Sequence, residues 1–385
     1  MDFTLTEEQQ LIQQTARKFA EAELAPVAAK LDSEGAQQVF YDNLQALAQL
    51  GFAGLNVRAE YGGTQADTIA YSLVITELAR ACASTAVTLS VTNMVAEVIQ
   101  AVGSEAQRQH YLPKLCGDYL AGSFCLTEPH AGSDPSAMRT SAQQRGDGWV
   151  LNGAKQFISS AAFAGVFVVW AVTDKAAKPG KGISCFLVEA GAPGLEVAKS
   201  ETKMGQHAST TSEVLFKDCF IPQNSLLGEP NQGYKIAVAE LAGGRIGIGS
   251  LALGIGLAAM DTARAYTLER EQFGQPIANF QGLQWMMADR YTELEAARLL
   301  LLSAADRKDR GLSFAKEASM AKLFASEKAN DACYSALQLM GGYGYTRDLP
   351  LERYARDVRI TTLYEGTSEI QRLIIARELL REVQL

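Results

Sequence analysis

The amino-acid sequence predicts a mainly helical α+β protein, in which a small β domain separates two helical regions. Apolar residues recur at helical spacing through roughly the first 115 residues and again from residue 231 nearly to the C-terminus. Between these regions, short runs rich in Val, Ile, Phe and Trp alternate with turn residues, a pattern typical of an antiparallel β-barrel or sandwich. We therefore predict an N-terminal all-α domain at residues 1–120, a middle β-barrel domain at 121–230 and a C-terminal four-helix bundle at 231–385.

The individual elements follow from local signals in each region. Thr6 and Gln9 form a capping box, in which each side chain can satisfy a free backbone amide of the other residue, so the chain opens with a helix. Further helices are predicted in the N-terminal region at 41–50, 68–82 and 86–102, and strands in the middle region at 148–152, 166–172, 183–188, 195–198 and 213–221. The last region contains four long helical patterns, at 234–270, 279–310, 313–340 and 368–383. Their short connections favour antiparallel neighbours, as in a helix bundle.

Composition and charge exclude several classes of function. The 385 residues carry a net charge of -8, which argues against a nucleic-acid surface. The six cysteines are scattered without a CxxC pair and only three histidines are present, so we expect neither a disulfide framework nor a metal site. The N-terminus has no basic segment followed by an apolar one, and the longest apolar runs, 161–172 and 246–260, are shorter than the roughly 20 residues of a membrane span. We expect a cytoplasmic protein without membrane insertion.

One glycine-rich segment fits a nucleotide-binding pattern in the wrong context. Residues 254–259, GIGLAA, match the loose GxGxxA form of a dinucleotide fingerprint. That fingerprint needs a preceding strand, whereas the residues from 236 onward already have a helical pattern. We therefore predict close helix packing, through small residues that recur on one helical face: Gly243, Gly247, Ser250, Gly254 and Ala258.

Glu365 is the main candidate for catalysis. A second capping-box pattern, Ser368 to Gln371, predicts that a helix begins at Ser368, so Glu365 lies in the loop just before it. Gly366 allows the backbone to bend sharply or to approach a ligand closely. Apolar and aromatic neighbours would disfavour the charged form of the carboxylate and nearby helix amides would favour it, a balance that suits a general base. A surface acid without function is an equally open interpretation of this segment alone.

Five motifs follow one another along the chain: LTEPHAGSD at 126–134, GGRIGIGSLALGIG at 243–256, REQFGQPI at 270–277, LMGGYGY at 339–345 and YEGTSEIQR at 364–372. Together they resemble the acyl-CoA dehydrogenase family over the length of the chain. The resemblance implies the family's three-domain fold, FAD as cofactor and desaturation of an acyl-CoA thioester between Cα and Cβ. It also implies an electron-transfer flavoprotein as electron acceptor and a homotetramer.

By position, Glu365 resembles the family's catalytic base, which removes the α proton while a hydride leaves Cβ for the flavin. Hydrogen bonds to the thioester carbonyl should carry a large share of catalysis, and the family draws them from the backbone amide at this position and from the flavin's ribityl chain. Subfamilies that act on isovaleryl or long-chain thioesters place the base at the position of Gly244, and glycine cannot abstract a proton. The sequence here is similar to the short-chain and short branched-chain enzymes, which implies substrates of about C4–C6.

The resemblance also implies residues for the cofactor and the substrate. FAD would be lined by Phe124, Leu126, Thr127, Gly132, Ser133, Phe157, Ile158, Ser159, Thr367 and Glu369, and by Arg270, Phe273, Gln281, Gln338, Gly341 and Gly342 of a neighbouring subunit. A guanidinium such as that of Arg270 suits a pyrophosphate because its planar fork donates two hydrogen bonds. The acyl-CoA would meet Ser133, Gly244, Arg245, Gly366 and Arg377. Phe157, Ala242 and His207 depart from the family pattern, and Ala242 puts one pantetheine hydrogen bond in doubt.

Three functions stay open on the sequence. The first is an FAD-dependent acyl-CoA dehydrogenase for short straight or simply branched thioesters. The second is an oxidase or flavin monooxygenase of the same fold that uses oxygen directly, and the third is a catalytically silent binding or assembly factor. The complete set of motifs favours the first. The acyl chain itself, and the choice between fatty-acid and branched-chain amino-acid breakdown, do not follow from the sequence.

Overall fold

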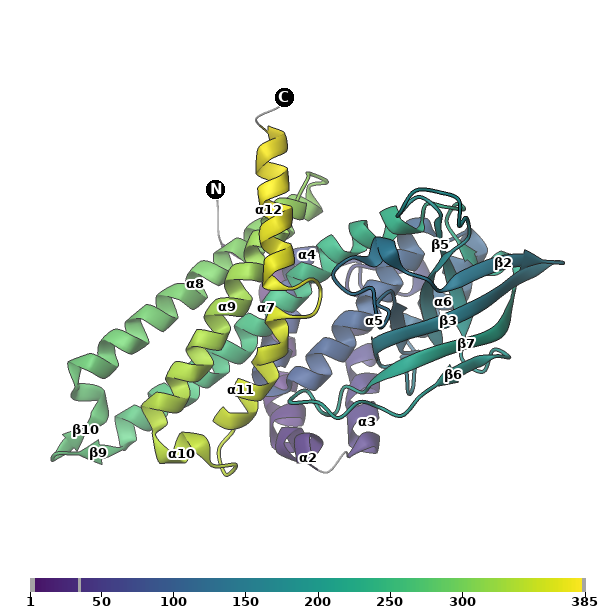
Figure 1. Cartoon of the computed structure of the whole chain (residues 1–385). Coiled ribbons are helices and arrows are strands. Elements are labelled where there is room, and N and C mark those ends of the chain that lie inside the picture. Colours follow the sequence, from purple (N-terminus) through teal and green to yellow (C-terminus); the bar gives the residue numbers. More distant parts are fainter. Residues whose placement is uncertain (1–3, 34–35, 383–385) are drawn as a thin grey trace.

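The computed structural model describes residues 4–33 and 36–382, and it has the predicted order of helical, β and helical regions (Figure 1). The N-terminal helices are α1 (Glu7–Phe19), α2 (Ala28–Ser33), α3 (Gln37–Gln49), α4 (Thr68–Ala81), α5 (Ala83–Val102) and α6 (Glu105–Cys116). The predicted first capping box is confirmed, since the Gln9 amide donates to Thr6 Oγ1 and the Thr6 amide to Gln9 Oε1. Nearly all side chains of α4 and α5 are buried, so these two helices form the inner layer of the region.

The middle region forms one mixed sheet. Its strands are β1 (Gly122–Cys125), β2 (Ser141–Arg145), β3 (Gly148–Ser159), β4 (Val166–Val172), β5 (Ile183–Glu189), β6 (Leu195–Val197), β7 (Thr211–Pro222) and β8 (Leu226–Leu227). They are ordered β6-β7-β3-β2-β4-β5-β8, with β1 paired in parallel to β4. Most pairs are antiparallel, as predicted, whereas β1–β4 and β2–β4 are parallel. The short strands β1, β2 and β8 were not predicted, because they lack an apolar run of their own.

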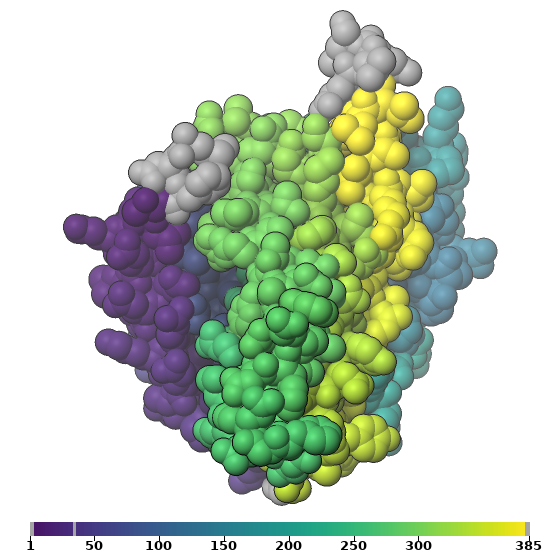
Figure 2. All heavy atoms as spheres, turned by 90° about the vertical axis from the view of Figure 1, so that its left-hand side faces the viewer, coloured from purple at the N-terminus to yellow at the C-terminus, as the bar shows by residue number. Residues whose placement is uncertain are grey.

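The C-terminal region contains the four predicted long helices. These are α7 (Gly233–Glu269), α8 (Gln281–Asp309), α9 (Ala315–Met340) and α12 (Ser368–Glu382). A small hairpin, β9 (Glu271–Gln272) with β10 (Gln275–Pro276), connects α7 to α8. Two shorter helices, α10 (Gly342–Tyr345) and α11 (Leu351–Arg359), lie between α9 and α12 and were not predicted. Figure 2 shows the C-terminal helices at the centre of one face, between the N-terminal helices and α12.

Helix α7 is the central element of the molecule, because it packs against α4 and α5 as well as α8 and α9. A β-carbon at Gly254 would lie 2.3 Å from the Thr76 carbonyl oxygen on α4, and one at Gly247 would lie 2.4 Å from Tyr71 Oη. Ser250 Oγ lies 2.7 Å from Ser72 Oγ. The small residues of α7 therefore let α4 approach closely, which confirms the helix-packing interpretation of the GIGLAA segment.

Helices α5 and α7 are long and apolar enough, by length and composition alone, to span a bilayer. This differs from the expectation based on unbroken apolar runs, because polar hydroxyl residues and glycines interrupt both helices without making them hydrophilic. In the fold, 78% and 83% of their most apolar segments are buried. A core helix of a soluble protein has the same properties, so they are weak evidence for a membrane.

Candidate active site

The turn between Thr362 and α12 holds Glu365 in the left-handed backbone region. Its φ is +54° and that of Gly366 is +86°, a conformation disfavoured for any residue with a β-carbon. Gln371 Nε2 donates to the carbonyl oxygens of both residues, at 3.0 and 2.8 Å. Lys322 Nζ, from α9, donates to the Gly366 carbonyl oxygen at 2.8 Å. Two buried side chains from different helices therefore fix this turn.

Helix α12 begins at Ser368, as predicted, but the predicted capping box at Ser368 and Gln371 is wrong. The Ile370 amide donates to Thr367 Oγ1 at 3.3 Å, so Thr367 provides the cap. Ser368 Oγ is buried without a hydrogen-bond partner among the described residues. Gln371 binds the loop carbonyls instead of a backbone amide, because two successive left-handed residues leave those carbonyls in need of donors.

The Glu365 carboxylate faces α7. Its Oε2 atom is buried and has no hydrogen-bond partner within residues 4–33 and 36–382. A β-carbon at Gly244 would lie 3.0 Å from this oxygen and 2.8 Å from Met94 Cε, so glycine at this position lets α7 pack closely against the carboxylate. Burial raises the pKa of Glu365 to about 7. A carboxylate with such a pKa can take up a proton near neutral pH.

Two buried cations lie beside Glu365. Arg245 and, to a smaller extent, Lys322 oppose the effect of burial and lower the pKa of Glu365. Arg245 is only 5% exposed; its Nη1 lies 3.4 Å from Ser319 Oγ, while its Nε has no partner in the described part of the chain. A buried guanidinium with a free donor is suited to a carbonyl or anionic ligand. Arg245 thus lies next to the candidate base.

The sheet brings together the first group of predicted flavin residues. The Gln156 amide donates to the Thr127 carbonyl oxygen at 2.9 Å, so the loop after β1 runs beside the end of β3. Phe157 is 64% exposed and has a φ of +58°, a strained backbone that presents an apolar ring to solvent. The Ser159 carbonyl oxygen is already occupied by Ser123 Oγ at 2.7 Å. An exposed aromatic side chain beside free loop backbone is a surface that a planar ring system can cover.

Two predicted flavin residues direct their side chains into the protein core. Ile158 is buried in the apolar cluster of the sheet, and the Phe124 ring packs on Trp170 with 4.3 Å between the ring centroids. Both can therefore offer only backbone atoms or a ring edge to a cofactor. Leu126 is also buried, whereas Ser133 is exposed and a β-carbon at Gly132 would meet no atom within 4 Å.

A buried ion pair under this surface was not found by sequence reasoning. Lys155 is completely buried, and its Nζ donates to Glu128 Oε1 at 2.8 Å and to the Leu126 carbonyl oxygen at 3.1 Å. The Glu128 carboxylate also accepts the backbone amides of Arg139 and Thr140. The pair fixes the LTEPHAGSD loop against β3. Lys155 stands between small and polar residues beyond the predicted strand at 148–152, so its local sequence carries no sign of burial.

The second group of predicted flavin residues lies around a cavity of about 720 Å³. Arg270, Gln338, Gly341 and Gly342 line it, together with apolar side chains such as Ile277 and Leu283. Phe273, at the tip of the β9–β10 hairpin, is 93% exposed and Gln281 is exposed at the start of α8. The cavity thus combines the Arg270 guanidinium, apolar side chains and the exposed backbone of two glycines, which fits one part of a dinucleotide.

Within one chain, the predicted flavin residues beside the sheet lie far from those around the cavity. The hairpin β9–β10 lies at the far end of α7 and α8 from the sheet that carries Phe157 (Figure 1). Thr367 caps α12 and Glu369 lies in its first turn, while Arg377 lies further along the same helix, where its Nε donates to Glu378 Oε1 at 3.3 Å. Burial lowers the pKa of Arg245, and Arg377 is close enough to lower it further.

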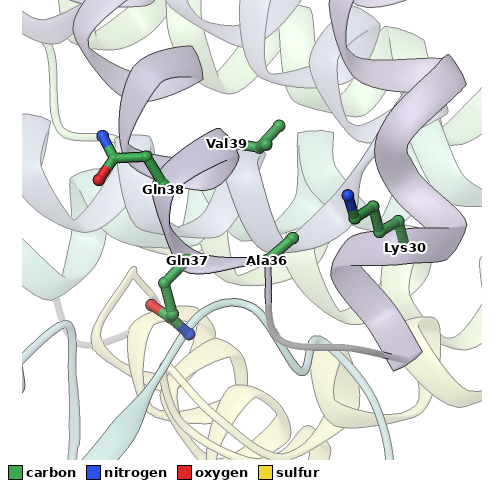
Figure 3. Close-up of a pocket in the computed structure, with 5 residues that line it drawn as sticks. All are labelled: Lys30, Ala36, Gln37, Gln38 and Val39. Carbon is green, nitrogen blue, oxygen red and sulfur yellow. The ribbon is translucent and has the colours of Figure 1, made fainter.

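A further cavity, of about 320 Å³, lies beside α2 and α3 (Figure 3). Lys30, Ala36, Gln37, Gln38 and Val39 line it, and none of the predicted site residues does. Within residues 4–33 and 36–382, no group of three His, Cys, Asp or Glu side chains could hold a metal ion, and the six cysteines are free and buried.

Comparison with known proteins finds similarity in all three regions of the chain. Models of the acyl-CoA dehydrogenase N-terminal, middle and C-terminal domains match residues 6–118, 123–219 and 231–380. The chain is 44% identical to the short-chain specific acyl-CoA dehydrogenase of Clostridium acetobutylicum, over 99% of this chain and 100% of that protein.

Two solved structures are also similar. Butyryl-CoA dehydrogenase from Megasphaera elsdenii has 40% identity and a TM-score of 0.96, covering 99% of this chain and 100% of that one. A chain from work on the electron transferring flavoprotein of Acidaminococcus fermentans and flavin-based electron bifurcation has 44% identity and a TM-score of 0.97, with the same coverage. Matches over the whole length, in all three domains, show that this chain belongs to the acyl-CoA dehydrogenase family.

Proposed function

We propose that this chain is an FAD-dependent acyl-CoA dehydrogenase that converts short acyl-CoA thioesters, straight or simply branched and of about C4–C6, to trans-2-enoyl-CoA. The observation that carries the proposal is the buried Oε2 atom of Glu365, which has no hydrogen-bond partner among the described residues and lies against Gly244 of α7. Family membership supplies the reaction class, and the two short-chain relatives support the substrate range.

In the proposed reaction, Glu365 accepts the α proton of the thioester. Gly244 lets the Glu365 carboxylate lie against α7, because a β-carbon there would lie 3.0 Å from Oε2. The Glu365 amide is the proposed donor to the thioester carbonyl, where negative charge grows as the proton leaves. Arg245 and Lys322 keep part of the Glu365 population ionised near neutral pH by lowering its pKa against the effect of burial. Gly366, Ser133 and Arg377 are the proposed contacts of the CoA portion.

FAD, when bound, supplies the acceptor for the hydride that leaves Cβ. The exposed Phe157 ring and the open loop at Gly132 fit the flavin portion of the cofactor. Phe124, Leu126, Thr127, Ile158, Ser159, Thr367 and Glu369 complete the proposed contacts on the same chain. Arg270 suits the pyrophosphate of a neighbouring subunit's FAD, together with Phe273, Gln281, Gln338, Gly341 and Gly342.

The separation of these two groups within one chain supports a homotetramer in which FAD sites are completed across an interface. In that assembly, Arg270→Ala should release FAD without disturbing the Glu365 turn. FAD content measured on size-exclusion fractions of the variant tests this: loss of flavin from an intact oligomer supports the shared site, and unchanged FAD affinity contradicts it. Proposed domain limits are 1–120, 121–230 and 231–385.

An electron-transfer flavoprotein is the proposed electron acceptor, which the similarity to a chain studied with such a protein supports. We also propose a cytoplasmic location, which the bacterial relative supports.

The test of the function is anaerobic mixing of the FAD-loaded protein with butyryl-, isobutyryl-, 2-methylbutyryl-, isovaleryl- and octanoyl-CoA, with absorbance of the oxidised flavin as readout. We expect rapid bleaching by one or more of the short thioesters and little by octanoyl-CoA. Bleaching by none of them would reject the proposal. Stoichiometric peroxide under air would indicate an oxidase instead, and failure to bind FAD would indicate a silent binding factor.

A further inference from the structure

Lys322 is a completely buried lysine in the middle of α9, one layer behind the Glu365 turn. Its neighbours on the buried face of the helix are small, namely Ala318, Ala321 and Ala325. A lysine in such a place loses the hydration of its ammonium group, which costs several kcal/mol unless partners compensate. A buried lysine without a role would be replaced at little cost by an apolar residue of similar size. Its environment therefore needs an explanation.

The Lys322 ammonium holds the backbone on which the candidate base is mounted. Its Nζ donates to the Gly366 carbonyl oxygen at 2.8 Å, where Gln371 Nε2 also donates at 2.8 Å. Glu365, at a φ of +54°, would relax to a more common conformation without such constraints. Because Gln371 is neutral and holds the same carbonyl, a second neutral donor would suffice if the hydrogen bond were the only purpose of Lys322.

The charge of Lys322 provides a second contribution. Burial raises the pKa of Glu365, while Arg245 and then Lys322 lower it. Burial also lowers the pKa of Lys322 to about 8, which leaves the ammonium largely protonated at pH 7. The titratable and charged groups that face this pair are Arg245 and Glu240 on α7, Glu327 on α9, Tyr71 on α4, Tyr364 in the turn, and Glu369 and Arg377 on α12. Of these groups, the cations that act on the Glu365 carboxylate are Arg245 on α7, with Lys322 itself on α9.

We propose that Lys322 is a positioning residue for the dehydrogenation step: it fixes the Glu365–Gly366 turn through the Gly366 carbonyl and supplies a buried positive charge that favours the ionised carboxylate. The proposal rests on the proposed function, because the ionised carboxylate is the form that accepts the α proton. Lys322 contacts the loop and neither the substrate nor the cofactor, so its effect is transmitted through Glu365. The α proton moves to Glu365 and Lys322 keeps its own proton.

The test compares pH profiles of flavin reduction in the FAD-loaded protein, with butyryl-CoA, or the best substrate found, under anaerobic conditions. Lys322→Met removes the donor and the charge, Lys322→Gln keeps a donor without charge, and Lys322→Arg keeps the charge. Lys328→Met is the matched control, since Lys328 lies on the same helix but is paired with Glu293 and Asp331 at the surface. The pH range is 5.5 to 9, which brackets the Glu365 pKa of about 7.

We expect the acid limb of the rate to move to higher pH by about one unit in K322M and K322Q, and hence the rate at pH 6 to fall about tenfold beyond any change in the plateau. K322R and K328M should keep the acid limb of the wild type. A plateau that is lower in K322M than in K322Q would report the loss of the hydrogen bond to Gly366.

Acid limbs that coincide in wild type, K322M and K322Q would overturn the proposal while leaving the proposed function intact. A wild-type protein that is not bleached by any thioester would overturn both. If K322M does not fold, K322Q carries the same comparison, because it changes the charge while retaining a donor.

Discussion

A β-carbon added at Gly244 would lie 3.0 Å from Glu365 Oε2, although 121 positions separate the two residues in the sequence. Gly244→Ala should therefore fold, because the other close atoms belong to the flexible end of Met94, but it should displace the Glu365 carboxylate from its position. We expect flavin reduction to slow by about 10- to 100-fold, as for a small misplacement of reacting groups.

Gly243→Ala is the matched control for this experiment. A β-carbon there would lie 3.3 Å from Lys308 Nζ, a flexible side-chain end, and no atom is closer. Stopped-flow measurements give the rate of flavin reduction in both variants, and thermal midpoints show whether both are folded. Equal rates for G243A and G244A would show that a β-carbon beside Glu365 does not disturb the reaction.

Glu365→Gln tests the base itself. The substitution keeps the shape of the side chain and removes its ability to accept a proton, so flavin reduction should fall by at least about 10³-fold. FAD content and thermal midpoint should stay at wild-type values, because Oε2 has no partner in the described chain whose loss could destabilise the fold. Full residual activity would move the base to another residue.

Gly254→Ala tests the packing interpretation of the GIGLAA segment. Its β-carbon would lie 2.3 Å from the Thr76 carbonyl oxygen, a backbone atom that cannot move without displacing α4. We expect the free energy of unfolding to fall by about 1–3 kcal/mol, while the folded protein keeps its FAD affinity. Gly282→Ala, where no atom lies within 4 Å, should be neutral or slightly stabilising. Loss of FAD from G254A without loss of stability would support a dinucleotide-binding role instead.

Phe157→Gly separates strain from cofactor binding. Glycine tolerates the φ of +58° at this position, so the FAD-free protein should become more stable by about 1 kcal/mol. The FAD dissociation constant should rise about tenfold, because the exposed ring is the proposed cover of the flavin. Differential scanning calorimetry with and without FAD measures both effects, and an unchanged FAD affinity would remove Phe157 from the site.

Asp357 should make stability depend on pH in the opposite sense to most carboxylates. Burial raises its pKa from 3.8 to about 6, against the hydrogen bond from the Gln206 amide. Because the pKa is raised in the folded state, the contribution of Asp357 to the free energy of unfolding is complete below about pH 4. It is lost as the pH rises through 6, by up to about 3 kcal/mol. Asp357→Asn, which stays neutral and can still accept from Gln206, should therefore gain stability relative to wild type between pH 4.5 and 7.5.

Urea unfolding at pH 4.5 and 7.5 measures the stability of D357N relative to wild type. Asp42 is exposed, so Asp42→Asn is the control. A difference between D357N and wild type that is the same at both pH values would show that Asp357 does not titrate in this range.

The sequence by itself determined the fold class, the order of the helical and β regions, and Glu365 as the residue to examine. These features depend on local periodicity and on motifs, which are visible in the sequence whatever the residues contact in the folded protein. The sequence did not predict β1, β2 and β8, because these short strands lack an apolar run. It also placed the α12 cap at Ser368 instead of Thr367, because Gln371 binds carbonyls of the loop and not a backbone amide.

Only the tertiary structure decided what surrounds the base. Lys322 and Arg245 are charged residues in helical patterns, and nothing in their local sequence indicates that both lie beside the Glu365 carboxylate. The same is true of Lys155 under the LTEPHAGSD loop. A pKa depends on burial and on charges brought together by packing, so it is a property of the assembled core, which residues distant in the sequence create jointly.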